Sequence, residues 1–119
     1  MSARQFPANI AQPLQELVTR LGRHYGERLR CVSLYGSMAR RTQRADSDID
    51  VLVVLDCINS LGDRLKAIGI ASDINVELEV LIELQVLSQA ELDFLRQTET
   101  LLARNLDRDG ITLYRDGIA

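Results

Sequence analysis

Residues 34–54 read LYGSMARRTQRADSDIDVLVV, and the rest of the chain is organised around this stretch. A glycine–serine pair, Gly36 and Ser37, follows an apolar run and can open a turn into a helix. Two acidic residues, Asp48 and Asp50, stand two positions apart at the start of a second apolar run. Because strand side chains alternate between faces, we expect both carboxylates on one face at one end of a strand.

A pair of carboxylates so placed favours a cation. Two like charges held close together are unfavourable unless a positive charge lies between them. Carboxylates with open coordination positions suit Mg²⁺, which keeps several waters and also binds phosphate oxygens. The turn at Gly36 and Ser37 would offer backbone N–H groups and a hydroxyl to those phosphates.

These residues carry a resemblance to a known family. The Gly36-Ser37 pair, followed after ten residues by Asp48-Ile49-Asp50, resembles the Gly-Ser-x10-Asp-x-Asp signature of the DNA-polymerase-β-like nucleotidyltransferases. The small size is similar to that of the minimal nucleotidyltransferases, which often act as antitoxins of HEPN-domain toxins. The resemblance implies the palm-like nucleotidyltransferase fold.

The resemblance also implies a reaction. A nucleoside monophosphate would pass from a nucleoside triphosphate to an acceptor hydroxyl, with release of pyrophosphate. Asp48 and Asp50 would hold two Mg²⁺ ions together with a third carboxylate, as in other two-metal sites. Gly36 and Ser37 would position the β- and γ-phosphates, and Arg40 would help to hold the triphosphate.

Three glutamates compete for the place of the third carboxylate. Residues 80–87 read VLIELQVL and predict a strand in which Glu83 interrupts an apolar face. A carboxylate there would be costly if buried and unpaired, but reasonable if it faced a bound metal. The stretch also resembles the family's third-acid strand, although the family has Asp there. We expect Glu83 in this role; Glu79, Glu77 and the absence of a working third acid remain alternatives.

Patterns along the remaining chain predict an α/β or α+β domain that spans residues 1–119. We expect strands over 29–35, 48–55 and 80–87 and a short edge strand at 111–114. The first helix is expected to bury one face made of Leu14, Leu17, Leu21 and Tyr25. A second helix is expected from about 60 to 78, on the spacing of Ile58, Leu61, Leu65 and Ile68, and a third from Ser88 to Gly110. The run 51–55 lacks alternation and predicts a central strand covered on both faces. We expect a small mixed sheet with helices packed on one face and the site at the strand ends.

Composition narrows the class of protein. The chain has 119 residues and a formal net charge of −3, which argues against a dedicated nucleic-acid binder. No apolar run approaches the roughly 20 residues that span a bilayer, and we expect no signal peptide. Cys31 and Cys57 are expected to be buried, reduced thiols. These features together predict a cytoplasmic location without a membrane partner.

Larger relatives carry a second domain that binds the acceptor, and too few residues lie outside the expected core to build one here. We therefore expect a partner to supply the acceptor, in a hetero-oligomer. The resemblance implies a HEPN ribonuclease toxin as that partner, neutralised when AMP passes from ATP to one of its hydroxyls, a tyrosine above all. The alternatives are a catalytically idle antitoxin that acts by binding alone and a small-molecule nucleotidyltransferase of the aminoglycoside-modifying kind.

Overall fold

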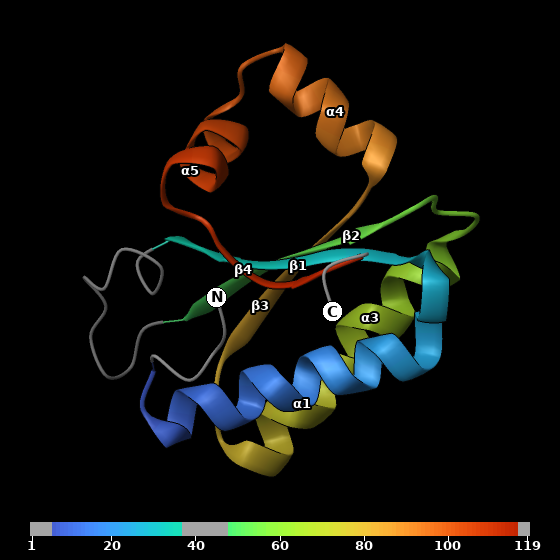
Figure 1. Ribbon diagram of the computed structural model, residues 1–119. Coiled ribbons are helices and arrows are strands. Elements are labelled where there is room, and N and C mark those ends of the chain that lie inside the picture. Colours follow the sequence, from blue (N-terminus) through green and yellow to red (C-terminus); the bar gives the residue numbers. More distant parts are fainter. Residues whose placement is uncertain (1–5, 37–47, 117–119) are drawn as a thin grey trace.

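The computed structural model describes residues 6–36 and 48–116. In chain order the elements are α1 (Ala8–Tyr25), the 3-10 helix η2 (Gly26–Arg28), β1 (Leu29–Tyr35), β2 (Ile49–Leu55), α3 (Leu61–Leu78), β3 (Ile82–Ser88), α4 (Gln89–Gln97), α5 (Leu101–Asp109) and β4 (Ile111–Arg115). The strands form one sheet in the order β3-β2-β1-β4 (Figure 1). β2 runs parallel to β3 and antiparallel to β1, and β1 runs antiparallel to β4, so the expected mixed sheet is confirmed.

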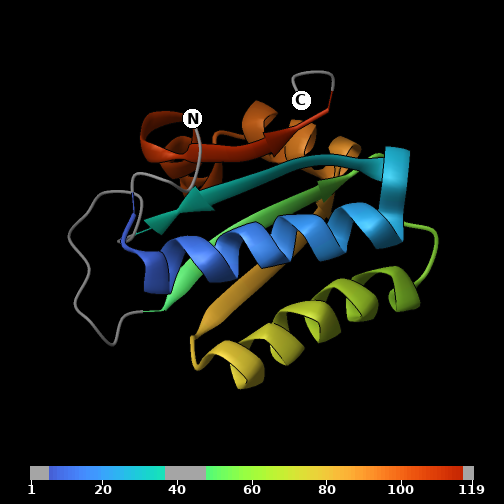
Figure 2. The ribbon, with the colours of Figure 1, turned by 60° about the horizontal axis from the view of Figure 1, so that its bottom comes forward.

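Helices cover both faces of this sheet. Val51, Val53 and Leu55 of β2 belong to the core beneath α1 and α3, which lie side by side on one face (Figure 2). Leu52 and Val54 point the other way, into a second core under α4 and α5. The α+β class is confirmed, but the expectation that helices pack on one face is wrong. A strand that is apolar on both sides needs cover on both sides.

The helix α1 follows its predicted pattern. Leu14, Leu17 and Leu21 are fully buried and Tyr25 nearly so, at spacings that keep them on one face. The helix begins after Pro7, which occupies the N-cap position. This apolar stripe anchors the helix against the sheet on the side away from Asp50.

The helix α3 forms where it was predicted but buries a different stripe. Its buried residues are Ala67, Ile70, Ala71 and Ile74. Leu61, Leu65 and Ile68, the larger residues whose spacing indicated the helix, are exposed. The buried pair of alanines leaves room for the neighbouring elements to approach closely, an effect that spacing alone does not reveal.

The expected helix over 88–110 is two helices. The capping box at its start is confirmed: the Ser88 hydroxyl accepts from the Glu91 N–H at 3.1 Å, and the Glu91 carboxylate accepts from the Ser88 N–H at 2.9 Å. The chain then turns at Glu99, whose φ is +53°, and Thr100 caps the next helix. The polar residues between the two apolar stripes permit this turn, and β4 follows as the expected edge strand.

Both cysteines are free thiols. Cys57 is exposed and Cys31 is half-buried, so the expectation of two buried thiols is wrong. In the parts of the chain that the structure describes, no helix combines the length and the apolar character that a membrane crossing requires.

Candidate active site

The predicted acidic residues lie where β2 begins. Asp48 directly precedes the strand and Asp50 is its second residue. Asp50 stands beside Tyr35 of β1 on one side and beside Glu83 of β3 on the other. Alternation along β2 places the Asp50 carboxylate on the face that carries α4 and α5. The sheet register therefore brings together residues that are distant in sequence.

Contacts from α3 hold the start of β3 in this register. The Asn75 side-chain amide donates to the Ile82 carbonyl at 3.1 Å, and its oxygen accepts from the Ile82 N–H at 2.8 Å. On the other side of β3, the Ile49 N–H donates to the Leu81 carbonyl at 2.7 Å. These bonds fix the backbone directly before Glu83, which pairs in register with Asp50.

The three carboxylates interact electrostatically. The negative charge of Asp48 and hydrogen bonding with it raise the pKa of Glu83, with smaller effects from lost hydration and from Asp50. Glu83 is exposed, so the expected cost of a buried, unpaired carboxylate does not apply to it. Its register position opposite Asp50 is what favours it as the third carboxylate. A group of like charges that disturbs its own ionisation is typical of a site that binds a cation.

Gly36 closes one side of this group. Its φ of +76° lies in the left-handed region, and a Cβ atom built there would collide with a carboxylate oxygen of Asp50. Only glycine lets the backbone come so close to the carboxylate. The predicted site residues Ser37 and Arg40 fall outside the described residues.

The other two candidates for the third carboxylate lie elsewhere. Glu77 forms an ion pair with Arg20 of α1 at 2.7 Å. Glu79 ends α3 in a left-handed conformation, with φ of 54° and ψ of 52°. Neither is paired in register with Asp50, as Glu83 is.

Tyr35 also lies next to the acidic group, although its sequence position alone suggested no role for it. Lost hydration, followed by the charges of Asp50 and Glu83, raises the pKa of its phenol. The phenol therefore stays protonated beside the carboxylates and can act as a hydrogen-bond donor. The sequence signal that could have indicated this role is the position of Tyr35 directly before Gly36, on the strand face that also carries Ser33.

The donor set suits a hard divalent cation. Asp48, Asp50 and Glu83 offer only carboxylate oxygens, which Mg²⁺ prefers over nitrogen and sulfur. In residues 6–36 and 48–116, no three acidic, histidine or cysteine side chains already surround a common point closely enough for a metal ion. The mutual repulsion recorded at Glu83 is the property that a cation would relieve.

Comparison with known protein families agrees with this geometry. The family model described as polymerase beta, nucleotidyltransferase matches residues 16–117. The chain belongs to this family. The match extends from α1 to the end of β4 and so includes both the sheet and the acidic group. Among curated proteins, none matches this chain.

Solved structures with a similar fold include toxin–antitoxin complexes. A toxin–antitoxin with AMP-PNP matches with a TM-score of 0.58 and 23% identity, over 85% of this chain and 73% of that chain. A complex of tri-AMPylated Shewanella oneidensis HEPN toxin with MNT antitoxin matches with a TM-score of 0.53 and 20% identity, over 87% and 71%. The toxin–antitoxin MntA-HepT matches with a TM-score of 0.52 and 20% identity, over 87% and 72%. At these identities the likeness shows the fold.

Proposed function

We propose that this nucleotidyltransferase is an antitoxin that transfers AMP from ATP to a hydroxyl of a HEPN ribonuclease toxin, a tyrosine above all, and so neutralises it. The observation that carries the proposal is the meeting of Asp48, Asp50 and Glu83 beside Gly36 in a chain of this family. The similar toxin–antitoxin folds support the partner, and the AMP-PNP and AMPylated complexes among them support the nucleotide.

The proposed reaction is a substitution at phosphorus. The acceptor hydroxyl oxygen forms a bond to the α-phosphorus of ATP, and the bond from that phosphorus to the oxygen bridging to the β-phosphate breaks. The bonding electrons leave with pyrophosphate, and the hydroxyl proton passes to solvent. The acceptor gains one phosphodiester-linked AMP, and no oxidation or reduction takes place.

The residues of this chain contribute by position and charge. Asp48, Asp50 and Glu83 would hold Mg²⁺, which when bound would offset the negative charge of the carboxylates and the phosphate oxygens. Gly36 lets the backbone approach the Asp50 carboxylate, with which a Cβ atom at this position would collide. The phenol of Tyr35 remains available as a donor next to the acidic group. Orientation and charge neutralisation of this kind supply most of the rate in phosphoryl transfer.

Addition of AMP explains how the toxin would be silenced. Each AMP adds one negative charge and a bulky base. Beside an RNA-binding surface it would repel the phosphate backbone, whose binding depends on cationic contacts. The modification would also outlast the complex, so an amount of this protein well below that of the toxin should suffice.

The deciding experiment measures the intact mass of the partner toxin. The toxin is incubated with a catalytic amount of this protein, ATP and Mg²⁺, and its ribonuclease activity is assayed in parallel. Gain of one or more adenylyl units with loss of ribonuclease activity supports the proposal. A toxin that stays unmodified and is inhibited only at equal stoichiometry would instead establish an antitoxin that acts by binding alone.

A further inference from the structure

A cavity lies on the same face of the sheet as Asp50. This cavity, of about 290 Å³, separates the sheet from α4 and α5. Cys31 and Ser33 of β1 and Leu52 of β2 line it from the sheet side. Leu92 of α4 and Leu106 of α5 line it from the helices. The site residues described above are not part of its lining.

Three arginines line this cavity: Arg30, Arg96 and Arg115. Arg96 forms an ion pair with Asp107 at 3.1 Å, and Arg30 forms one with Asp116 at 2.8 Å. Arg115 has no ion-pair partner among residues 6–36 and 48–116. The three cations therefore exceed the two nearby carboxylates by one positive charge, although the whole chain is acidic.

The cavity also offers hydrogen-bond donors that residues 6–36 and 48–116 leave largely unused. A guanidinium carries five N–H groups, and the ion pairs of Arg30 and Arg96 each engage one nitrogen. On the floor, the buried Ser33 hydroxyl lies 3.2 Å from the Cys31 sulfur, a weak partner. Several donors around one net positive charge are suited to a carboxylate or a phosphate group.

The sheet sets the distance between this cavity and the acidic group. Tyr35 lies next to Asp50, and Ser33 is the next residue of β1 on the same face, about 7 Å away at the spacing of a strand. Cys31, which pairs with Arg115 of β4, lies about 13 Å from Tyr35 by the same spacing. One face therefore carries a negative end and a positive end within reach of one extended substrate.

We propose that this cavity is an acceptor subsite, which binds an anionic group, a carboxylate or a phosphate, carried by the molecule that receives the nucleotide. This inference rests on the proposed function, because it assumes that the acceptor approaches the acidic group along this face. An acidic side chain a few residues from the acceptor hydroxyl would have the required chemistry and reach. The arginines would then orient the acceptor and would take no part in the reaction itself.

The first test measures anion binding by nuclear magnetic resonance of the full chain. Inorganic phosphate and, separately, succinate are titrated in the presence of Mg²⁺ and a saturating non-hydrolysable ATP analogue. We expect shifts at the amides of Cys31, Ser33 and Arg96, and about ten-fold weaker binding in Arg115→Ala. The anion that binds more tightly identifies the preferred group. Arg23→Ala is the matched control, since Arg23 is an exposed arginine of α1, on the opposite face.

Two results of this titration would overturn the inference. Equal affinity in wild type, Arg115→Ala and Arg23→Ala would show that the cavity does not bind the anion. Phosphate shifts that appear only in a parallel titration without the ATP analogue would assign the cavity to the nucleotide and not to the acceptor. Thermal unfolding of Arg115→Ala should match wild type, because its side chain is exposed on an edge strand.

The second test separates this inference from the proposed function. In the AMP-transfer assay with the toxin, Arg115→Ala should raise the KM for the toxin about ten-fold and leave the KM for ATP unchanged. Arg23→Ala should change neither. If wild type transfers AMP and Arg115→Ala has the same KM for the toxin, only the acceptor subsite is wrong. If wild type transfers no AMP, the proposed function and the acceptor role fail together, and the titration alone decides whether an anion site exists.

Discussion

The two ends of β2 carry charged groups with opposite character. At its start, Asp48 and Asp50 lie with Glu83 in a group of three carboxylates. Directly after its last residue, Asp56 shares the guanidinium of Arg28 with Asp63, which lies in the first turn of α3. The two groups flank the same strand. The second includes the cation Arg28, whereas like charges dominate the ionisation of Glu83 in the first.

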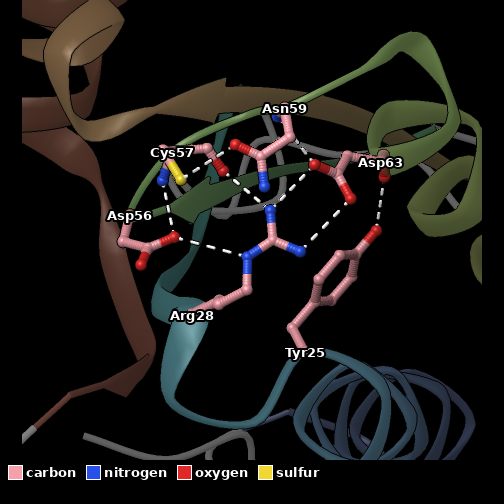
Figure 3. Close-up of polar contacts among 6 residues, drawn as sticks. All are labelled: Tyr25, Arg28, Asp56, Cys57, Asn59 and Asp63. Atoms are coloured by element: carbon pink, nitrogen blue, oxygen red, sulfur yellow. Dashed lines mark hydrogen bonds and ion pairs between the residues drawn. The ribbon is translucent and has the colours of Figure 1, made fainter.

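The group at the end of β2 includes its own cation, Arg28 (Figure 3). Two nitrogens of Arg28 donate to the two carboxylate oxygens of Asp63, at 2.8 and 3.2 Å. Arg28 also donates to the Cys57 carbonyl at 2.9 Å, and the Asn59 N–H donates to Asp63 at 2.8 Å. The Tyr25 hydroxyl donates to the backbone carbonyl of Asp63. These bonds join η2 to the loop that leads into α3.

The two groups shift ionisation in opposite directions. Arg28, followed by the Asn59 N–H, lowers the pKa of Asp63 to about 2. The negative charge of Asp48, followed by hydrogen bonding with it, raises the pKa of Glu83. The first pattern stabilises the fold by itself, whereas the second leaves repulsion that an external cation can relieve. The contacts of Arg28 and the direction of the pKa shift together distinguish a structural ion pair from a candidate binding site at the other end of β2.

The largest expected effect comes from removal of both aspartates of the acidic group. The double substitution Asp48→Asn, Asp50→Asn should lower AMP transfer by at least about 1,000-fold, because the ligands for the cation are lost. The fold should persist, since amides keep the shape and remove the repulsion. Transfer is measured by toxin mass and folding by circular dichroism. Undiminished transfer by the double variant would sink the assignment of a metal site.

Glu83→Gln sharpens the comparison because it should change the rate of AMP transfer and the melting temperature in opposite directions. Transfer in Mg²⁺ should fall about 100-fold if Glu83 is the third ligand. Without Mg²⁺ the melting temperature should rise, because a group whose pKa is raised in the folded state destabilises it once ionised. Glu79→Gln is the matched control and should leave the transfer rate unchanged. A Glu83→Gln protein that loses stability and keeps its rate would mark Glu83 as structural.

Gly36→Ala tests the close approach of the backbone to Asp50. The added Cβ would meet the Asp50 carboxylate and would sit at positive φ, so the free energy of unfolding should fall by about 1–2 kcal/mol. AMP transfer should fall about ten-fold as Asp50 is displaced. Gly69→Ala, in open space within α3, should instead raise stability by about 0.5–1 kcal/mol. Equal behaviour of the two variants would contradict the crowded geometry at Gly36.

Much of the fold was open to prediction because its signals are local. The bounds of β1 agree with the expected strand at 29–35, and the start of α4 follows from its capping box. The continuous apolar run in β2 indicated that both faces of the sheet are covered. It did not indicate which helix packs on which face. The choice of the alanine stripe in α3 and the turn at Glu99 depend on tertiary packing, which periodicity does not report.

The candidate site was open to prediction only in part. Asp48 and Asp50 stand out by spacing, because both lie at the start of one strand. Their relation to Glu83 and Tyr35 depends on pairing between β1, β2 and β3, which a single sequence does not specify. The roles proposed for these residues stay predictions.

The smallest expected effect concerns acid stability at the other end of β2. Asp63 has a folded pKa of about 2 against an ordinary value of 3.8, so its ionised form is favoured by folding. Its contribution is complete above the ordinary value and is lost as the pH falls from about 4 to about 2, where the unfolded chain takes up the proton first. Asp63→Asn should therefore lower the melting temperature at pH 7 and flatten its decline between pH 4 and pH 2, while AMP transfer at pH 7 stays as in wild type.

Asp73→Asn, an exposed residue of the same helix with no ion pair in the described part of the chain, is the control and should change neither. Melting curves of the three proteins at closely spaced pH values, together with the transfer assay at pH 7, measure both effects. If Asp63→Asn keeps the wild-type slope in acid, the Arg28 pair is too solvent-exposed to matter for stability. If it instead impairs transfer, the two ends of β2 are coupled, and the separation between structural and functional charge does not hold.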